Sequence, residues 1–245
     1  MIPVLGVPVL NRPELLQAMF DTIDYGPIDR LFIIDNGGVI PGNIKRWPTH
    51  VNRYHVANPG YNMGVAASWN HIIKANMNAP WWLIVNNDVK FEPGILQRLV
   101  EEVTDEPAVW RIEMGNESTW GSHFGAFAIN AGAVERVGWF DENIYPVYWE
   151  DTDFVARANA LELPLHLLKS PRTFHEGNAS WKRKPELGKA NDNSWKGNVA
   201  YFTSRWGSED DGWKTPEDPS TWQPPRLSRF RHQQWPVDYK DSGKV

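Results

Sequence analysis

The first half of the chain alternates short apolar segments with segments in which apolar side chains recur at helical spacing. Strands are predicted at residues 4–10, 31–34, 51–56 and 81–85, and helices at 14–23 and 65–77. Apolar strands that alternate with helices are typical of a mostly parallel sheet covered by helices on both faces. This alternation predicts an α/β fold.

The second half of the chain is more mixed in character. Helices are predicted at residues 92–103, 131–137, 151–161 and 192–206, and strands at 124–129 and 165–168. After residue 180 the sequence becomes rich in Lys and then in Pro, Trp and Arg. We therefore expect one domain over residues 1–180, with halves of about 1–90 and 91–180, followed by a C-terminal extension over 181–245 that is helical and then irregular.

Composition excludes several classes of protein. Hydrophobic residues make up 41% of the 245 residues and the net charge is -5, which favours a globular fold and disfavours a non-specific nucleic-acid binder. The chain has 0 Cys, so disulfides, zinc–thiolate sites and thiol chemistry are excluded. No apolar run approaches the roughly 18 residues of a membrane span, and the first residues lack a basic signal-peptide region. We expect a soluble, cytoplasmic protein.

Polar side chains follow three of the predicted strands where each strand ends. The clusters are Asn11-Arg12, Asp35-Asn36 and Asn86-Asn87-Asp88. One such cluster alone would be explained as a turn, because Asn and Asp are good turn formers. Since the carboxyl ends of parallel strands meet at one edge of a sheet, three clusters favour a shared cleft.

The chemistry-bearing motifs occur in a characteristic order. They are Asp35-Asn36-Gly37, Asn62-x-Gly64 with Asn70, Asn86-Asn87-Asp88, and Gly138-Trp139-Phe140-Asp141-Glu142 leading to Glu150-Asp151-Thr152-Asp153. The ordered set, over about residues 3 to 180, resembles family 2 glycosyltransferases of the GT-A fold, especially the rhamnosyl- and galactofuranosyltransferase-like branch. The resemblance implies a mostly parallel mixed sheet flanked by helices. It also implies inverting, metal-dependent transfer of a sugar from a nucleoside-diphosphate sugar, UDP- or dTDP-linked, to an acceptor hydroxyl.

The resemblance implies a nucleotide-sugar site made by residues of the first half: Pro8, Arg12, Asp35, Asn62, Gly64, Asn70, Asn86 and Asn87. For three of them a structural role is the alternative. The Asp35 carboxylate can accept hydrogen bonds from a base or close a turn onto Gly37. Arg12 can line the pocket or be a solvated residue at a helix start. Gly64 can let a helix N-terminus approach phosphate or simply permit close packing.

Asp88 matches the last acid of the DxD-type metal motif of the family, and Asn86 replaces the first acid. Mg²⁺ and Mn²⁺ prefer carboxylate oxygens, so the resemblance implies that Asp88 binds a divalent cation together with the diphosphate. His175 follows the last predicted strand and is the candidate second ligand, which would suit Mn²⁺. A structural histidine is the alternative.

Three acids lie within four residues at Glu150-Asp151-Thr152-Asp153. Acids at a helix start complement the helix dipole, and Asp153 is four residues from Arg157, the spacing of a helical ion pair. The resemblance implies that Asp151 is the general base and that Glu150 shapes the acceptor site. Aromatic residues suited to binding an acceptor sugar are Tyr148, Trp149 and Trp181.

Two other functions remain possible from the sequence. A nucleotidyltransferase would also have a sheet and a metal-binding acid, but residues 7–13 lack the glycines of its usual phosphate loop. A catalytically inactive or lectin-like module would keep the aromatic residues but would not need Asp88 or Asp151. Within the glycosyltransferase hypothesis, the acceptor is a glycan, a lipid-linked sugar, a protein or a modified nucleotide.

Overall fold

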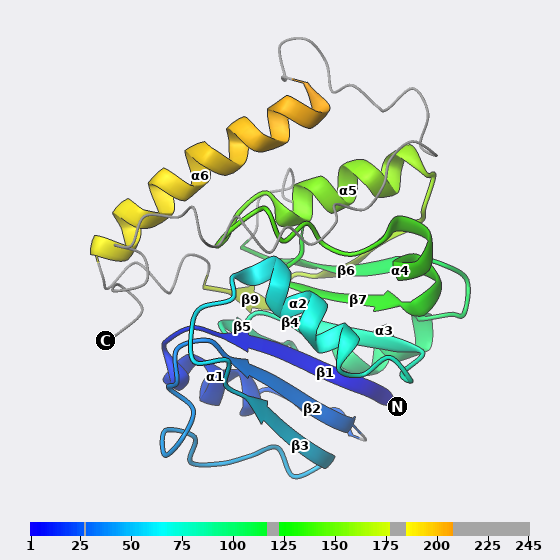
Figure 1. The fold of residues 1–245 in the computed structure, drawn as a ribbon. Helices are drawn as coiled ribbons and strands as arrows, with labels where there is room; N and C mark the ends of the chain where they lie inside the picture. Colours follow the sequence, from blue (N-terminus) through cyan, green and yellow to red (C-terminus); the bar gives the residue numbers. More distant parts are fainter. Residues whose placement is uncertain (27, 117–122, 177–184, 208–245) are drawn as a thin grey trace.

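The computed structural model describes residues 1–26, 28–116, 123–176 and 185–207, with the side chains of 185–191 excepted. A seven-stranded sheet lies at its centre in the order β3-β2-β1-β4-β7-β6-β8 (Figure 1). Its strands are β1 (Ile2–Val9), β2 (Ile28–Asp35), β3 (Val51–Ala57), β4 (Trp81–Val85), β6 (Val109–Met114), β7 (Ala126–Asn130) and β8 (Leu165–Ser170).

The sheet is mixed. β1 is parallel to both β2 and β4, β2 is parallel to β3, and β6 is parallel to β8. β7 is antiparallel to its neighbours β4 and β6. A separate two-stranded antiparallel sheet pairs β5 (Val89–Lys90) with β9 (Phe174–His175). The predicted mostly parallel mixed sheet is thus confirmed.

Helices cover both faces of the large sheet. They are α1 (Pro13–Phe20), α2 (Val65–Lys74), α3 (Ile95–Glu102), α4 (Ala131–Val137), α5 (Glu150–Ala160) and α6 (Pro185–Trp206). Apolar side chains of α1 and α3 pack with one face of the sheet, and those of α2, α4 and α5 pack with the other. This three-layer arrangement covers the central strands β1, β4 and β7 on both sides, which is why their sequences are almost continuously apolar.

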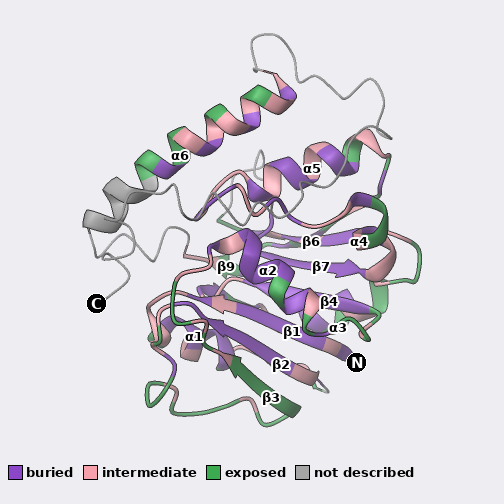
Figure 2. Ribbon diagram, in the orientation of Figure 1, coloured by how far each residue is buried: buried purple, intermediate pink, exposed green. Residues whose placement is uncertain are grey.

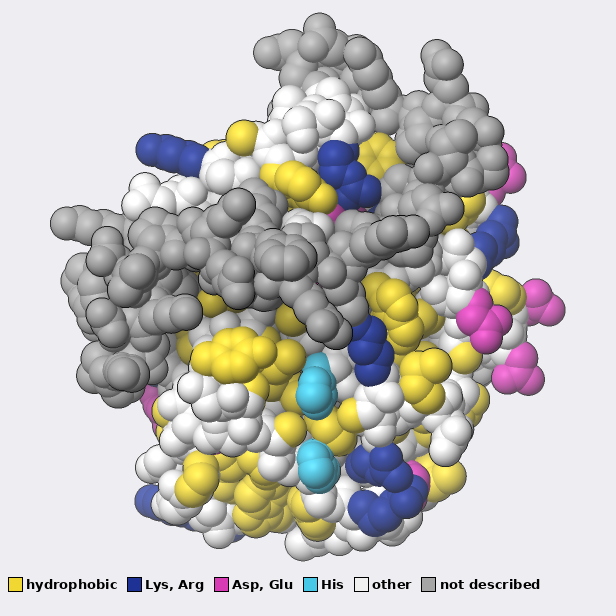
Figure 3. All heavy atoms as spheres, viewed as in Figure 1, with side chains coloured by type: hydrophobic (Ala, Val, Ile, Leu, Met, Phe, Trp, Pro, Cys, Tyr) yellow, Lys and Arg dark blue, Asp and Glu magenta, His cyan; other side chains and the backbone are white. Residues whose placement is uncertain are grey.

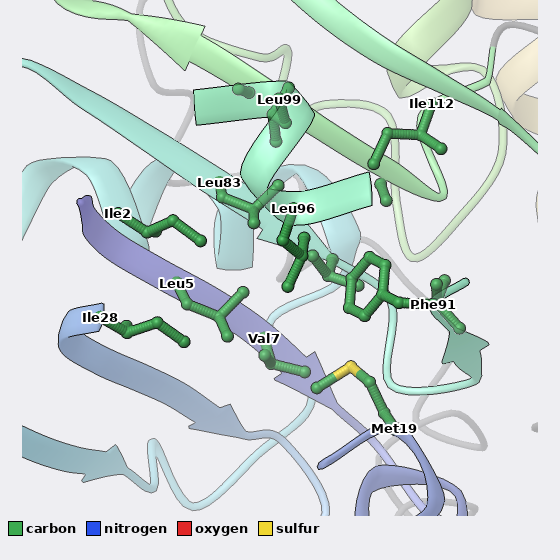
Figure 4. Close-up of a cluster of buried hydrophobic side chains, with 14 of the residues drawn as sticks. Ile2, Leu5, Val7, Met19, Ile28, Leu83, Phe91, Leu96, Leu99 and Ile112 are labelled. Carbon is green, nitrogen blue, oxygen red and sulfur yellow. The ribbon is translucent and has the colours of Figure 1, made fainter. Parts of the chain in front are cut away.

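Strand β1 shows how the period of two divides its side chains between the layers. Leu5 and Val7 point into the cluster that also holds Met19 of α1 and Leu96 of α3 (Figure 4). Gly6 faces the opposite layer, where an added Cβ would lie 2.4 Å from Ile72 of α2. A glycine here therefore lets α2 pack closely on the sheet. Burial falls at the two edge strands, β3, whose middle residues are exposed (Figure 2), and β8, which has three exposed residues.

Most predicted elements are confirmed, with ends that shift by a few residues. Strand β6 was not predicted, because Arg111 and Glu113 interrupt its apolar pattern. The two-residue strands β5 and β9 were also missed, since their pairing is set by tertiary contacts. The predicted helix at 192–206 begins earlier, at Pro185.

The predicted domain border near residue 180 falls in residues 177–184, outside the described part of the chain, and the division stays a prediction. Within the described part, helix α6 lies beside α5 (Figure 1) and its residues Phe202 and Trp206 are buried. On the face drawn in Figure 3, the described Lys and Arg side chains are scattered rather than gathered into one basic field. Among the described helices, none combines the length and the apolar character that crossing a membrane requires.

Candidate active site

The three polar clusters predicted from strand ends meet at one edge of the sheet. β2, β1 and β4 are adjacent and parallel, so their carboxyl ends lie side by side. Pro8 lies near the end of β1, opposite Ile34 of β2. The backbone N–H of Asn36 donates to the Val9 carbonyl at 2.7 Å, and the Asn87 side chain donates to the Asn11 carbonyl at 3.1 Å. The predicted convergence is thereby confirmed.

Asp35 ends β2 and is fully buried. Its two carboxylate oxygens accept hydrogen bonds from the backbone N–H groups of Val39 at 2.9 Å and Ile40 at 3.0 Å. The carboxylate therefore closes the loop after β2, at Val39 and Ile40 rather than at Gly37.

Asn36, which sequence reasoning did not single out as a site residue, joins two neighbouring segments. Its amide donates to the Ser68 hydroxyl at 2.9 Å, and its carbonyl oxygen accepts from the Met63 N–H at 3.0 Å. These bonds hold the start of α2 against the end of β2. The sequence feature that could have identified Asn36 is its position directly after Asp35, at the end of a strand.

The start of α2 approaches a second loop very closely. Gly64 precedes the helix with φ 82°, and an added Cβ would lie 2.7 Å from the Tyr145 ring and 3.0 Å from the Pro146 carbonyl oxygen. The Tyr145 hydroxyl donates to the Asn62 carbonyl at 2.9 Å. The Val65 N–H donates to Pro146 at 2.8 Å. Gly64 thus lets residues 62–65 approach residues 145–149 closely.

Asn70 is fully buried one helical turn further along α2. Its side chain donates to the Phe140 carbonyl at 2.9 Å and to a Glu142 carboxylate oxygen at 2.8 Å, and it accepts from the Phe140 N–H at 3.0 Å. These bonds join α2 to the segment that follows α4. Because these bonds satisfy the buried amide, a structural role is enough to explain why Asn70 is buried.

Asp88 and His175 come together although they are far apart in the sequence. Their Oδ1 and Nε2 atoms are 3.1 Å apart. The small sheet causes this, because Val89 of β5 pairs with His175 of β9, and the Glu176 N–H donates to the Asp88 carbonyl at 3.1 Å. The Asn86 amide lies 3.5 Å from the same imidazole nitrogen.

The side chains of Asp88 and His175 are suited to bind a divalent cation that a substrate also coordinates. It offers one carboxylate and one imidazole, and no group of three His, Cys, Asp or Glu suited to a metal occurs among the described residues. Mg²⁺ is commonly held by one or two carboxylates together with substrate phosphates and water. Two protein ligands are therefore sufficient when a diphosphate supplies further oxygen ligands.

Asn116 supports the pair directly, and Arg12 lies next to it, beside Glu176. The Asn116 side chain accepts from the His175 N–H at 3.0 Å and donates to the His175 carbonyl at 2.5 Å. Sequence reasoning missed Asn116 because it missed strand β6, which ends just before it. The Arg12 backbone has the left-handed conformation, with φ 60°. Its side chain forms an ion pair with Glu14, and its Nη1 atom lies 3.7 Å from Oε1 of Glu176.

Glu150 and Asp151 open helix α5 in contrasting environments. Glu150 is only 5% exposed, and its Oε2 has no hydrogen-bond partner among the described residues. Burial, and secondly the charge of Asp151, raise the pKa of Glu150 well above its ordinary value of 4.5. Asp151 is partly exposed and accepts from the Thr152 N–H at 2.7 Å. Neighbouring carboxyl groups in such unlike surroundings are suited to different roles.

Asp153 has the structural role that was predicted for it. Its carboxylate is fully buried and accepts from Arg157 Nε at 2.9 Å. It also accepts from Arg205 at 3.1 Å and from the Trp206 indole at 2.9 Å, both on α6. The sequence spacing revealed the first partner, but the other two depend on how α6 docks.

The predicted acceptor residues Tyr148 and Trp149 lie directly before α5. Both are half-buried and have left-handed backbones, with φ 74° and φ 81°. The Trp149 ring packs against Phe202 of α6, with the ring centroids 4.9 Å apart. Trp181 lies outside the described residues.

Comparison with known proteins supports a relationship at low sequence identity. No protein-family model matches the chain. A galactofuranosyl glycosyltransferase of Leishmania donovani is 23% identical in an alignment that covers 99% of this chain and 70% of that protein.

Solved structures share the fold. S. aureus TarS matches with a TM-score of 0.55 and 14% identity over 71% of this chain, and its complex with UDP-GlcNAc matches with 0.54 and 13% over 73%. This chain spans only 59% and 61% of those two chains. The catalytic domain of Drosophila β1,4-galactosyltransferase 7 in complex with xylobiose gives 0.52 and 13% over 74% of this chain and 72% of that one. The chain therefore has the GT-A fold, and its sequence is similar to that of a galactofuranosyl glycosyltransferase.

Proposed function

We propose that this protein is an inverting, metal-dependent glycosyltransferase that moves a sugar from a nucleoside-diphosphate sugar to an acceptor hydroxyl. One observation carries the proposal. The donor-side loop at Asn62–Val65 is bonded directly to the segment that leads into Asp151, through Tyr145 at 2.9 Å and Pro146 at 2.8 Å. These bonds support the proposal, because the proposed nucleotide-sugar residues and the proposed general base then belong to one continuous structure.

In the proposed reaction, Asp151 takes the proton of the acceptor hydroxyl while its oxygen attacks the anomeric carbon of the donor sugar. The bond between that carbon and the diphosphate oxygen breaks, and the nucleoside diphosphate leaves with its electron pair. Attack from the side opposite the leaving group inverts the anomeric configuration. Glu150, whose pKa is raised well above 4.5 by burial and by the charge of Asp151, is proposed to shape the acceptor site beside Asp151.

Asp88 and His175 are the residues that would hold Mn²⁺ or Mg²⁺, with Asn86 and Asn87 beside them. A bound cation would neutralise charge on the departing diphosphate. Asp35, Asn62 and Gly64 line the same edge of the sheet and are proposed to receive the nucleoside. Arg12 is proposed to lie on the diphosphate side, next to Glu176.

The comparisons support the class of substrate. The TarS complex contains UDP-GlcNAc, which favours a nucleotide-linked donor with a uridine base; a thymidine base is the alternative that a panel with dTDP-sugars also tests. The Drosophila enzyme complex contains xylobiose, which favours a glycan acceptor. A lipid-linked sugar, a protein or a modified nucleotide would present the same hydroxyl chemistry.

The test uses a panel of UDP- and dTDP-sugars with Mn²⁺ and measures release of the nucleoside diphosphate, with and without simple glycan acceptors. We expect wild-type turnover and a loss of about 10²- to 10⁴-fold in kcat for Asp151→Asn, the usual contribution of general-base catalysis. Binding of the nucleotide should persist in that variant. Asp192→Asn, which makes the same change at an exposed position, serves as control.

Two outcomes would contradict the proposal. Full activity of Asp151→Asn would remove its role as base. Binding of sugars without turnover by the wild type would favour the lectin-like alternative instead.

A further inference from the structure

Helix α6 contacts the predicted acceptor loop through one buried amide. Asn198 is fully buried. Its side-chain N–H groups donate to the carbonyls of Val147 at 3.0 Å and Tyr148 at 3.1 Å. Its Oδ1 accepts from the Tyr145 N–H at 3.3 Å. One side chain of α6 thus satisfies three backbone groups of residues 145–149.

The segment held by Asn198 has an unfavourable backbone conformation. Tyr148 and Trp149 are consecutive non-glycine residues with φ 74° and φ 81°. Such residues are uncommon in the left-handed region and persist where the surroundings over-determine them. The surroundings here come from α6, because the Trp149 ring also packs against Phe202 at 4.9 Å and Trp195 at 6.1 Å.

The conformation of this segment sets the direction in which α5 starts. Trp149 is the residue immediately before the helix, and Glu150 and Asp151 form its first turn. Helix α6 is also fixed to α5 itself, since Arg205 and Trp206 both donate to Asp153. α6 therefore fastens the loop and the helix to each other on either side of Asp151.

We propose that Asn198 is a positioning residue for sugar transfer, which holds residues 145–149 so that Asp151, Tyr148 and Trp149 face the acceptor in the reactive orientation. This inference rests on the proposed function of Asp151. Asn198 touches no reacting atom and acts only through the backbone of the loop. Its effect is therefore expected on the acceptor side of the reaction, while the nucleotide site at the ends of β1, β2 and β4 is unchanged.

The kinetic test compares wild type with Asn198→Asp, which keeps the size of the side chain but replaces its donor with an acceptor that faces two carbonyl oxygens. We expect kcat to fall roughly 10- to 100-fold, the cost of a small misplacement of catalytic groups, with an increased KM for the acceptor. The Kd for uridine diphosphate with Mn²⁺, measured by calorimetry, should stay at the wild-type value. Asn193→Asp makes the same change at an exposed position of α6 and should behave as wild type.

A second arm measures the structure without any substrate. Hydrogen–deuterium exchange read by mass spectrometry should be faster over residues 145–152 of Asn198→Asp and unchanged over α1 and α3, which pack on the opposite face of the sheet. If Asn198→Asp fails to fold, Phe202→Leu serves in its place, because it removes the ring packed on Trp149 but keeps an apolar side chain.

The outcomes separate the two proposals. Wild-type turnover together with unaltered kinetics and exchange in Asn198→Asp would overturn the positioning role alone. Faster exchange throughout the molecule, with kcat reduced only in proportion to the folded fraction, would show a merely structural role and would also overturn it. A wild type that turns over no donor sugar would instead overturn the proposed function.

Discussion

Adjacent carboxyl groups at the start of α5 show how burial separates the chemistry of two neighbours. Glu150 is enclosed and its pKa is raised well above 4.5, whereas Asp151 is partly exposed. The sequence identifies both as acids at a helix start, and nothing in it distinguishes their surroundings. The difference between a buried carboxyl group with a raised pKa and a partly exposed candidate base depends on the packing around them.

Replacing Glu150 with Gln should change how stability depends on pH. In wild type, Glu150 retains its proton in the folded state at pH values where the unfolded chain has released it. The free energy of unfolding therefore falls as pH rises above about 4.5 towards the raised folded pKa. Glu150→Gln should remove this decline, as measured by urea unfolding at pH values from about 4, near the ordinary carboxyl pKa, to about 8.

Exposed Glu135→Gln is the matched control and should leave the slope as in wild type. If Glu150→Gln and wild type give parallel curves over the whole interval, Glu150 is ionised in the folded state and the assignment is wrong.

His175→Ala should weaken the binding of Mn²⁺ in the presence of uridine diphosphate, because it removes the nitrogen that lies 3.1 Å from Asp88. Loss of an outer hydrogen-bond partner of a metal ligand typically costs about 10- to 100-fold in affinity, and loss of a ligand should cost at least as much. Calorimetric titration of Mn²⁺ measures the effect. His50→Ala, at an exposed position, should be neutral, and equal affinities of the two variants would place the metal elsewhere.

At the scale of elements, the contact between the start of α2 and residues 145–149 decides how the donor and acceptor sides meet. Gly64 permits it by its φ of 82° and by its lack of a side chain. The sequence places Gly64 at a helix start, but its partner Tyr145 is supplied by a distant segment. Only the fold reveals why glycine is needed there.

Gly64→Ala should lower the free energy of unfolding by about 2 kcal/mol, since the new Cβ is strained at this φ and would lie 2.7 Å from the Tyr145 ring. Urea unfolding measures the change. Gly197→Ala is the informative control, because a Cβ at this helical position meets nothing within 4 Å and should stabilise by about 0.5–1 kcal/mol. Stability changes of the same sign in both variants would contradict this account.

At the scale of the whole molecule, α6 is joined to the rest of the protein by buried charges. Arg205 donates to Asp141 at 2.6 Å and to Asp153 at 3.1 Å, and both carboxylates are fully buried. The Tyr201 hydroxyl also donates to Asp141, and burial together with this carboxylate raises the pKa of Tyr201 to about 12. Helix α6 thus completes an ionic network that begins in the predicted 1–180 domain.

Arg205→Met should lower the free energy of unfolding by about 3 kcal/mol, because it leaves two buried carboxylates short of a cationic partner. The value lies at the low end for a broken buried pair, since the Arg205 side chain is 21% exposed. Urea unfolding is the measurement, and Lys196→Met at an exposed position of α6 is the control. Equal stability of the two variants would show that α6 docks without help from this network.

The sequence by itself determined the layered α/β architecture, the polar ends of three strands and the order of the motifs. These features depend on local periodicity and on strand adjacency, which residue patterns record directly. Asp153 with Arg157 was predictable for the same reason, because a spacing of four residues on a helix fixes their contact.

Tertiary structure alone decided the rest. The resemblance to a known family suggests Asp88 and His175 as partners, but their contact arises because two short strands pair, and those strands carry too few residues to show a period. The pKa of Glu150 is raised because the fold buries its side chain, and Asn198 reaches the acceptor loop because α6 docks on α5. Burial and long-range contact depend on the packing of segments that are remote in sequence, and no local pattern encodes them.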